Sequence, residues 1–294
     1  MGVIYRFMAT TIHQGFLELQ RNLNITSIQE TVLAERQQNI RRVLESEFIV
    51  VDTFLMGSYK RNTIIAPLSK ADVDIFVVLD HGYFQRSGPY PILERIRELL
   101  TAANLVSGIR PDAPAVTVTF DDFKVDVVPG FNRPVDGYFI PEPSLKGWLP
   151  TNPKKHIEIW SRENGNHVGK LVPLLKMLKG WNSKHSRSLR SFHLETMSLQ
   201  IARGIEIADY SLAVGYVFDN ARVKVKLPTQ DEAGYGGNVG DYLDTHAKMS
   251  VATSALEAAY AGSIEATEME SRGMTFEAFQ KWRVIFGDYF PAYG

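Results

Sequence analysis

The segment GSYKRNTIIAPLSKADVDIFVVL, residues 57–79, decides the fold of this chain. An apolar run leads up to Gly57 and predicts one strand, and DVDIFVVL, which begins at Asp72, predicts another. Because side chains at positions i and i+2 of a strand share a face, Asp72 and Asp74 point the same way. Two carboxylates so placed repel each other unless a cation lies between them. The pair therefore predicts a metal site.

A third carboxylate, Asp126, lies in the alternating segment KVDVV, where Val125 and Val127 point to the opposite, apolar face. Three strand-borne Asp residues can hold two Mg²⁺ ions, or Mn²⁺ in their place, about 4 Å apart. A lone D-x-D is more often an exposed pair at a strand edge. Its combination with a strand-end Gly-Ser and a third strand-centred Asp is much rarer by chance. We therefore predict a catalytic metal site at Asp72, Asp74 and Asp126.

The Gly57-Ser58 pair stands where a strand ends and a helix begins. A missing side chain lets the backbone approach a phosphate there, and free N–H groups and the Ser hydroxyl can bind it. Lys60 and Arg61 add positive charge nearby. These four residues are therefore predicted to bind a nucleotide, although a Gly-Ser pair after a strand also suits a plain turn.

The composition is that of a globular protein with a full core. The chain has 294 residues, of which 45% are hydrophobic, and a net charge of −1. This near balance favours small ligands over duplex DNA or RNA, whose binding needs basic excess. The absence of cysteine excludes disulfides, thiolate zinc sites and Cys nucleophiles. Without a signal-like segment or an apolar run of about 18 residues, we expect a cytoplasmic protein with no membrane partner.

The first half reads as a small mixed sheet with flanking helices. Residues 25–47 predict a helix with candidate N-caps at Thr26 and Ser27, and Glu30 follows Ser27 as in a capping box. Its apolar positions at helical spacing are Ile28, Val32, Ile40 and Leu44. A further helix is expected around 91–103.

Two strands, 115–120 and 123–128, are predicted to join at Asp121-Asp122. Residues 129–157 are rich in Pro and Gly, which predicts an ordered loop between lobes.

From His167 onward the pattern becomes helical. The fold class is therefore α+β. We expect a core with an N-terminal helix over residues 1–150 and a helical lobe over residues 151–294.

Together these motifs resemble the GS…DxD…D pattern of the polymerase-β-like nucleotidyltransferase superfamily. Within it, the chain is similar to the bacterial cGAS/DncV-like nucleotidyltransferases (CD-NTases) of anti-phage signalling. The likeness rests on residues 57–79 and on segments that reach the end of the chain: KVDVVPGF, DGYFIPEPSLKGWLPTNPKKH, KLVPLLKMLKGWN, RSFHLETM and WRVIFGDYFP. It implies a bilobal enzyme with its active site between the lobes. Such an enzyme uses Mg²⁺ to join nucleoside triphosphates into a cyclic di- or trinucleotide messenger, releasing pyrophosphate, in anti-phage (CBASS) signalling.

The resemblance also implies roles for particular residues. Ser58 would bind the donor triphosphate, and the three aspartates the metals. In the helical lobe, Lys176 and Ser191 would contact phosphates and Phe192 would stack on a base, for which any π-face serves. Alternatively, Lys176 extends to the surface from an apolar helix and Phe192 is plain core.

Two further places carry weaker predictions. The segment DEAGYGGN, from Asp231 to Asn238, resembles a loop near the nucleotide, but its glycines equally suit a turn. Asn166 and His167 are expected to open the helix on the cleft side, where they contact a base or cap that helix.

Two other functions stay open. One keeps the chemistry but changes the acceptor, as in an adenylyltransferase acting on an RNA end, an antibiotic or a protein. The other is a silent nucleotide-binding module, against which the three intact carboxylates argue. The zinc-binding insertion by which animal cGAS grips DNA requires cysteines, so we expect no zinc and no activation by DNA. A regulatory partner protein remains open.

Overall fold

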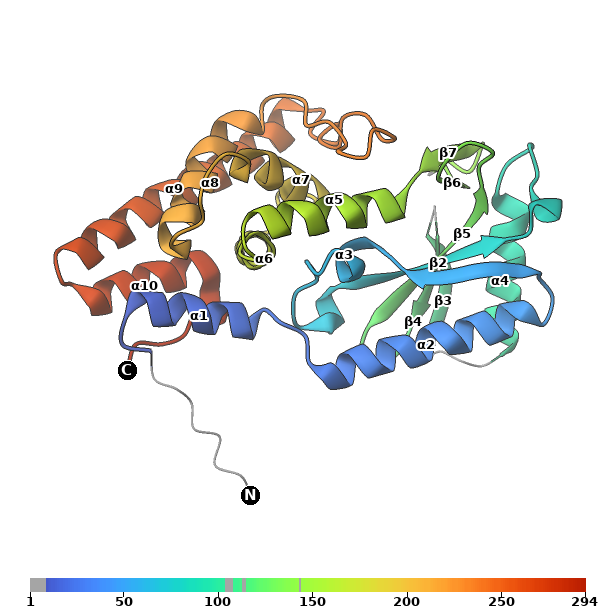
Figure 1. Ribbon diagram of the computed structural model, residues 1–294, viewed down its shortest axis with the longest axis horizontal. Helices are drawn as coiled ribbons and strands as arrows, with labels where there is room; N and C mark the ends of the chain where they lie inside the picture. The colour runs from blue at the N-terminus through green and yellow to red at the C-terminus, as the bar shows by residue number, and fades with distance from the viewer. Residues whose placement is uncertain (1–8, 104–107, 113–114, 143) are drawn as a thin grey trace, which may run out of the picture. The chain divides into compact units, whose positions relative to one another are not determined.

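The computed structural model describes residues 9–103, 108–112, 115–142 and 144–294, which form two compact units (Figure 1). The core unit is Ile25–Ser161. The helical unit joins the segment up to Asn24 to Arg162–Gly294. This division differs from the expected boundary at residue 150. The helix expected over residues 25–47 lies in the core unit, and an earlier helix, α1 (Ile12–Asn22), belongs to the helical unit. Among the described residues, no helix is long and apolar enough to cross a membrane.

The core unit is a mixed sheet with flanking helices, as predicted. Its strands follow the order β1-β2-β5-β4-β3, with β6 paired to β5 and β7. Only the β2–β5 pairing is parallel among those described. The elements are α2 (Ser27–Glu45), β1 (Val50–Leu55), α3 (Gly57–Lys60), β2 (Asp72–Leu79), α4 (Tyr90–Ala102), β3 (Gly108–Asp112), β4 (Ala115–Thr119), β5 (Lys124–Asn132), β6 (Tyr138–Pro141), β7 (Trp148–Thr151), and the 3-10 turns Leu68–Lys70 and His81–Tyr83. Helix α5 (Pro153–Asn166) begins in the core unit and continues past Ser161 into the helical unit.

The two faces of the sheet differ in composition. On one face, Val73 and Ile75 of β2 and Val127 of β5 pack in the main core, which α2 and α4 cover. The other face holds a smaller apolar cluster around Phe76 and Val128. Because side chains alternate along a strand, the three aspartates belong to this second face, which we call the site face.

Helix α2 begins one residue earlier than a Ser27 cap would place it. Thr26 is the N-cap, and its partner in the capping box is Gln29, whose side chain accepts from the Thr26 N–H at 2.9 Å. The proposed Ser27–Glu30 box is therefore wrong. Ile28 is also misplaced in the apolar stripe, since it lies in the first turn and is 75% exposed. The buried positions are Leu33, Ile40 and Leu44.

The expected loop over residues 129–157 is largely ordered structure instead. Strand β5 continues to Asn132, and β6, β7 and the start of α5 follow. Pro129 lies beyond Val127, the last residue of β5 that pairs with β4, where a strand tolerates a missing N–H. Pro153 opens α5, a position at which proline is favoured. These prolines therefore lie where β5 has no β4 partner and where α5 begins, and they do not exclude regular structure.

The helical unit includes α1 because of aromatic packing. Its elements are α1 (Ile12–Asn22), α6 (Leu171–Lys184), α7 (Ser191–Ala202), α8 (Tyr210–Lys224), α9 (His246–Ser271), α10 (Thr275–Phe286) and the turn Gly287–Tyr289. Phe16 of α1 is 2% exposed and makes edge contacts with Trp282 and Phe290 near the end of the chain. These aromatic contacts tie α1 to α10.

Candidate active site

The turn from β1 into α3 is built around Gly57. The Met56 N–H donates to the Asp74 carbonyl oxygen at 2.9 Å, which continues the β1–β2 pairing to the turn. Gly57 has φ +61°, a left-handed conformation that favours glycine. A Cβ atom here would lie 2.0 Å from Asp74 Oδ2. The glycine therefore lets the Asp74 carboxylate lie directly against the backbone that precedes Ser58, and the predicted strand-to-helix turn is confirmed.

The pairing of β2 with β5 brings the aspartates to one place. Asp74 and Asp126 are direct partners across the parallel strands, and Asp72 is the partner of Lys124. Neighbouring strands lie about 4.8 Å apart, so the Asp74 and Asp126 side chains stand side by side on the site face. Both are half-buried, and Asp72 is exposed at the start of β2. Lys124 brings one positive charge to this group of three carboxylates.

Asp126 has a buried partner that the sequence reasoning missed. The Thr117 hydroxyl donates to Asp126 Oδ1 at 2.6 Å, and Thr117 is 3% exposed. The two residues are direct partners in the β4–β5 hairpin. A signal for this pair existed, because Thr117 and Asp126 are equidistant from the predicted turn at Asp121-Asp122.

Within the described residues, no group of three or more His, Asp or Glu side chains is close enough, in its present conformation, to hold a metal ion. Asp74 lies against Gly57, Asp126 is bonded to Thr117, and Asp72 faces solvent. Side-chain rotation about fixed strands would be needed for all three to share an ion. The metal triad therefore stays a prediction, supported by the register and by the hard oxygen donors.

The remaining predicted nucleotide contacts of the core unit differ in their exposure. The Ser58 carbonyl oxygen accepts from the N–H groups of Thr63 and Ile64 at 2.8 and 3.0 Å, which fixes the turn after α3. Lys60 is exposed. Arg61 is only 8% exposed, and its guanidinium lies 5.3 Å from the centroid of the Trp160 ring. Arg61 thus packs within the core unit, and its contact with a nucleotide stays a prediction.

Comparison with known proteins places this site in a family. The model for second messenger oligonucleotide or dinucleotide synthetase domains matches residues 9–164, more than half of the chain. The chain belongs to this family. The cyclic AMP-AMP-AMP synthase of an Acinetobacter species is 30% identical over 190 residues, which cover 61% of this chain and 54% of that synthase. The chain thus spans about half the length of this curated relative.

Solved structures agree with the fold of a synthetase domain. CdnC of E. coli MS115-1, in complex with a HORMA protein, has a TM-score of 0.76 and 16% identity, over 95% of this chain and 98% of that one. DncV of Vibrio cholerae, a cyclic AMP-GMP synthase and prokaryotic cGAS homologue, has a TM-score of 0.72 and 12% identity, over 96% and 98%. The prediction of a cGAS/DncV-like nucleotidyltransferase is confirmed. This family of enzymes uses a divalent metal ion.

The predicted nucleotide contacts of the helical unit all lie beyond the segment that the family model matches. The Lys176 Nζ donates to Asn24 Oδ1 at 2.8 Å. Ser191 is the exposed first residue of α7, and Phe192 beside it is half-buried. Asn166 ends α5 rather than opening a helix, because α6 begins only at Leu171. The nucleotide contacts of these residues stay predictions.

Asp231 and Asn238 organise the loop in which they lie. Asp231 is 8% exposed, and its Oδ2 accepts from the N–H groups of Tyr235 and Gly236 at 3.0 and 2.9 Å. Asn238 Oδ1 accepts from the N–H of Thr229 at 2.9 Å. These bonds define an ordered turn, which is the plainer of the two interpretations of this segment. Contact with a nucleotide is untested.

His193 anchors the same loop to α7. It is 1% exposed, and its ring nitrogens lie 3.0 Å from the Tyr242 hydroxyl and 3.2 Å from the Thr229 hydroxyl. Burial lowers the pKa of His193 to about 4, so the ring is neutral at neutral pH. Its role is structural.

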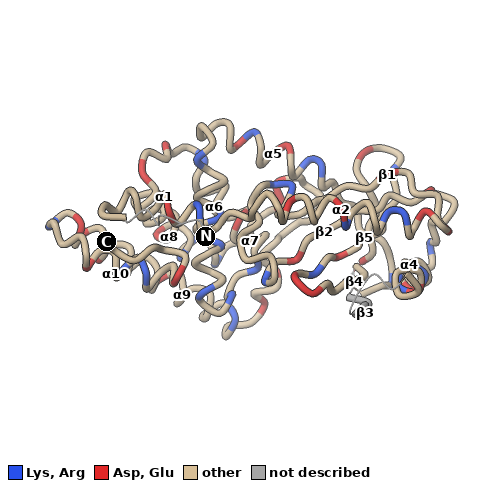
Figure 2. The backbone as a smooth tube through the Cα atoms, turned by 90° about the horizontal axis from the view of Figure 1, so that it is seen from below, with Lys and Arg blue, Asp and Glu red and all other residues tan. Residues whose placement is uncertain are grey.

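Lys and Arg are interspersed with Asp and Glu along the described backbone of both units (Figure 2). This agrees with the net charge of −1, and the absence of DNA activation stays a prediction.

Proposed function

We propose that this synthetase-domain protein uses Mg²⁺ to join nucleoside triphosphates into a cyclic di- or trinucleotide, with release of pyrophosphate, in a CBASS anti-phage system. The observation that carries the proposal is the direct pairing of Asp74 with Asp126 beside the Gly57-Ser58 turn. All of these residues lie within the segment that matches the family. The name of the Acinetobacter relative supports a cyclic product. We place the reaction in the cytoplasm, where nucleoside triphosphates are made.

The donor set fits a hard divalent ion, because three carboxylates share one sheet face beside Lys124. Asp72, Asp74 and Asp126 would hold Mg²⁺, with Mn²⁺ as a substitute. When bound, the metal lowers the pKa of the attacking hydroxyl and neutralises charge on the departing pyrophosphate.

The residues of the chain supply the positioning. Ser58 and the backbone N–H groups of the turn would hold the donor triphosphate. The Asp126 carboxylate orients the 3′- or 2′-hydroxyl of the acceptor and accepts its proton. The hydroxyl oxygen then bonds to the donor α-phosphorus as the bond to pyrophosphate breaks. A second attack in the same site closes the ring. Such catalysis is mostly orientation and charge neutralisation.

A regulatory partner protein is part of the proposal, because CdnC of E. coli was solved both with ATP and with a HORMA protein.

The test is mass spectrometry of the products formed from mixed labelled nucleoside triphosphates, with Mg²⁺ and with Mn²⁺. Phosphatase-resistant small products are expected. In Asp72→Ala/Asp74→Ala they should fall at least about a hundredfold while circular dichroism stays unchanged. Asp121→Ala, an exposed aspartate of the β4–β5 turn, is the control and should match wild type. Substantial synthesis by the double variant overturns the assignment. Label on RNA, an antibiotic or a protein would identify an adenylyltransferase instead.

A further inference from the structure

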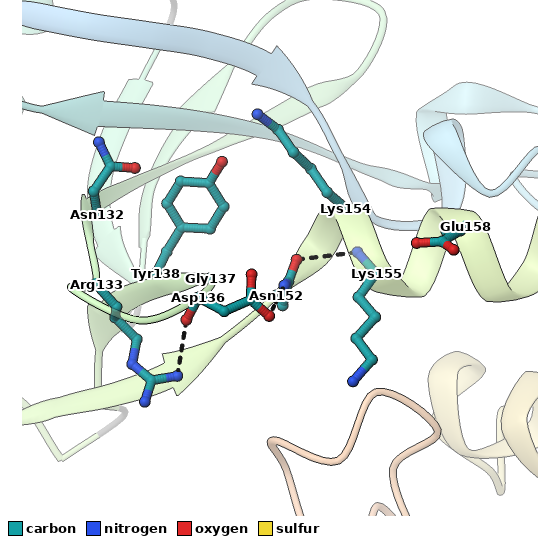
Figure 3. Close-up of a pocket in the computed structure, with 9 residues that line it drawn as sticks. All are labelled: Asn132, Arg133, Asp136, Gly137, Tyr138, Asn152, Lys154, Lys155 and Glu158. Atoms are coloured by element: carbon teal, nitrogen blue, oxygen red, sulfur yellow. Dashed lines mark hydrogen bonds between the residues drawn. The ribbon is translucent and has the colours of Figure 1, made fainter.

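A polar pocket lies on the core unit, and its lining does not include the three aspartates. It has a volume of about 500 Å³ and lies between the β5–β6 turn and the start of α5 (Figure 3). Its lining comprises Asn132, Arg133, Asp136, Gly137, Tyr138, Asn152, Lys154, Lys155 and Glu158. Three of these side chains are basic and two are acidic, so the pocket carries an excess of positive charge.

A glycine turn and two hydrogen bonds form the framework of this pocket. Gly137 has φ +74°, and a Cβ atom there would lie 2.4 Å from the Thr151 carbonyl oxygen. Asn152 is 7% exposed. Its Nδ2 donates to Asp136 Oδ2 at 3.0 Å, and its Oδ1 accepts from the Lys155 N–H at 3.0 Å. These bonds join the β5–β6 turn to the first turn of α5, so the pocket is formed without a ligand.

The basic residues are placed against the ordinary preference of a helix. Lys154 and Lys155 both lie in the first turn of α5, and that turn contains no acidic residue. A helix N-terminus carries partial positive charge and favours anions, so two lysines there oppose the helix dipole. Departures from such local rules concentrate at functional sites. An anion bound in the pocket would offset both the lysines and the helix end.

The side chains divide the pocket into two ends. In Figure 3, Arg133 and Lys155 extend on either side of Asp136 and Asn152, and Lys154 points the opposite way, toward the strands. Lys154 Nζ lies 3.5 Å from Asp52 Oδ2 and 4.8 Å from the Phe54 ring centroid. The Tyr138 hydroxyl, followed by Asp52, raises the pKa of Lys154, so this cation keeps its charge at neutral pH.

The pocket shares a strand face with the aspartates. Asp126, Val128, Gly130 and Asn132 alternate along β5 on the site face, and Phe76 packs over Gly130 between the two ends. Asn132 is six positions after Asp126, which at about 3.3 Å per residue corresponds to at most about 20 Å. The two places therefore lie on one sheet face, on either side of the buried cluster around Phe76 and Val128.

We propose that this pocket binds the polyphosphate chain of a nucleotide that is not the donor. The identity of that nucleotide as the acceptor rests on the proposed function. Two triphosphates in one active site repel each other, so the acceptor's own triphosphate needs cationic surroundings apart from the Ser58 turn. Arg133, Lys154 and Lys155 provide them.

Calorimetry of the full chain with inorganic tripolyphosphate, in the presence of EDTA, tests the pocket. Lys155→Gln should weaken binding about five- to tenfold, and Glu158→Gln should strengthen it by a similar factor, since each changes one charge beside the anion. Both substitutions are conservative for an exposed helix. Arg86→Gln, an exposed residue outside the pocket, is the control. Unchanged affinity in Lys155→Gln and Glu158→Gln overturns the proposal.

A kinetic comparison identifies the source of the polyphosphate. Each nucleotide is offered as acceptor in its 5′-triphosphate and 5′-monophosphate forms, and the ratio of kcat/KM for the two forms is measured. Wild type should favour the triphosphate, and Lys155→Gln should lose about five- to tenfold of that ratio. An unchanged ratio together with weakened tripolyphosphate binding overturns the acceptor assignment and indicates a free polyphosphate effector. Failure of all nucleotide joining would overturn the proposed function, whereas the calorimetry would still decide the pocket.

Discussion

Replacing Thr117 by valine tests whether the hydrogen bond to Asp126 positions a metal ligand. Valine keeps the size and branching of threonine but removes the hydroxyl that donates to Asp126 Oδ1 at 2.6 Å. A hydrogen bond to a charged group contributes about 1.5–3 kcal/mol. Removing a partner that orients a metal ligand typically costs about 10- to 100-fold in metal affinity or activity. The two magnitudes agree, because tenfold corresponds to about 1.4 kcal/mol.

The assay follows Mn²⁺ binding by electron paramagnetic resonance and the metal dependence of product formation. Thr117→Val should raise the Mn²⁺ dissociation constant about 10- to 100-fold. Thr117→Ser keeps the donor and should restore most of the affinity. Thr53→Val is the matched control, because Thr53 is also a buried strand threonine. Its carbonyl oxygen accepts a hydrogen bond from the Gln37 side chain of α2. The Mn²⁺ affinity of Thr53→Val should equal that of wild type.

Urea unfolding separates positioning from a loss of structure. Because the lost hydrogen bond contributes about 1.5–3 kcal/mol, Thr117→Val should lower the free energy of unfolding by that amount and still unfold in one cooperative transition. The reasoning is refuted if Thr117→Val binds Mn²⁺ like wild type, or if Thr117→Ser is as impaired as Thr117→Val.

Two further predictions concern Gly57 and His193. Gly57→Ala would put a Cβ atom 2.0 Å from Asp74 Oδ2, on a backbone with φ +61°. Product formation should therefore fall at least about tenfold, while urea unfolding should show a stability loss of only about 1–2 kcal/mol. Full activity would show that the position of Asp74 is not critical. Burial lowers the pKa of His193 from 6.5 to about 4, so below pH 6.5 the unfolded chain binds a proton that the folded chain does not. The free energy of unfolding therefore decreases as pH falls, and this group accounts for about 2 kcal/mol of the loss between pH 7.5 and 5. His193→Gln should show a shallower decrease of the free energy of unfolding with falling pH, measured by urea unfolding. Equal pH dependence in the variant and wild type would contradict the assignment.

Local patterns predicted the parts of the site that depend on neighbours in the chain. The period-two alternation of a strand placed Asp72 and Asp74 on one face, and Val125 and Val127 on the other. The Gly57 turn followed from its position after an apolar run. The hairpin symmetry about Asp121-Asp122 even contained the Thr117–Asp126 pair.

Prediction failed where local composition competed with longer-range pairing. The Pro- and Gly-rich residues after 129 suggested a loop, but β6 and β7 form there because each pairs with a neighbouring strand. The sequence left the cap of α2 open between Thr26 and Ser27, and the capping box was placed on the wrong one of the two. Two bonds distinguish them: the Thr26 N–H donates to Gln29 Oε1, and the Gln29 N–H donates to the Thr26 hydroxyl.

The sequence by itself determined the alternation of faces, the glycine turn and the identity of the three carboxylates, since each is encoded within a few residues. Only the tertiary structure decided that β2 pairs with β5, so that Asp74 meets Asp126, and that α1 packs with α10. It also assembled the pocket from the β5–β6 turn and the start of α5. Such contacts join residues far apart in the chain, and they depend on which packing buries the most apolar surface, a property that no local pattern encodes.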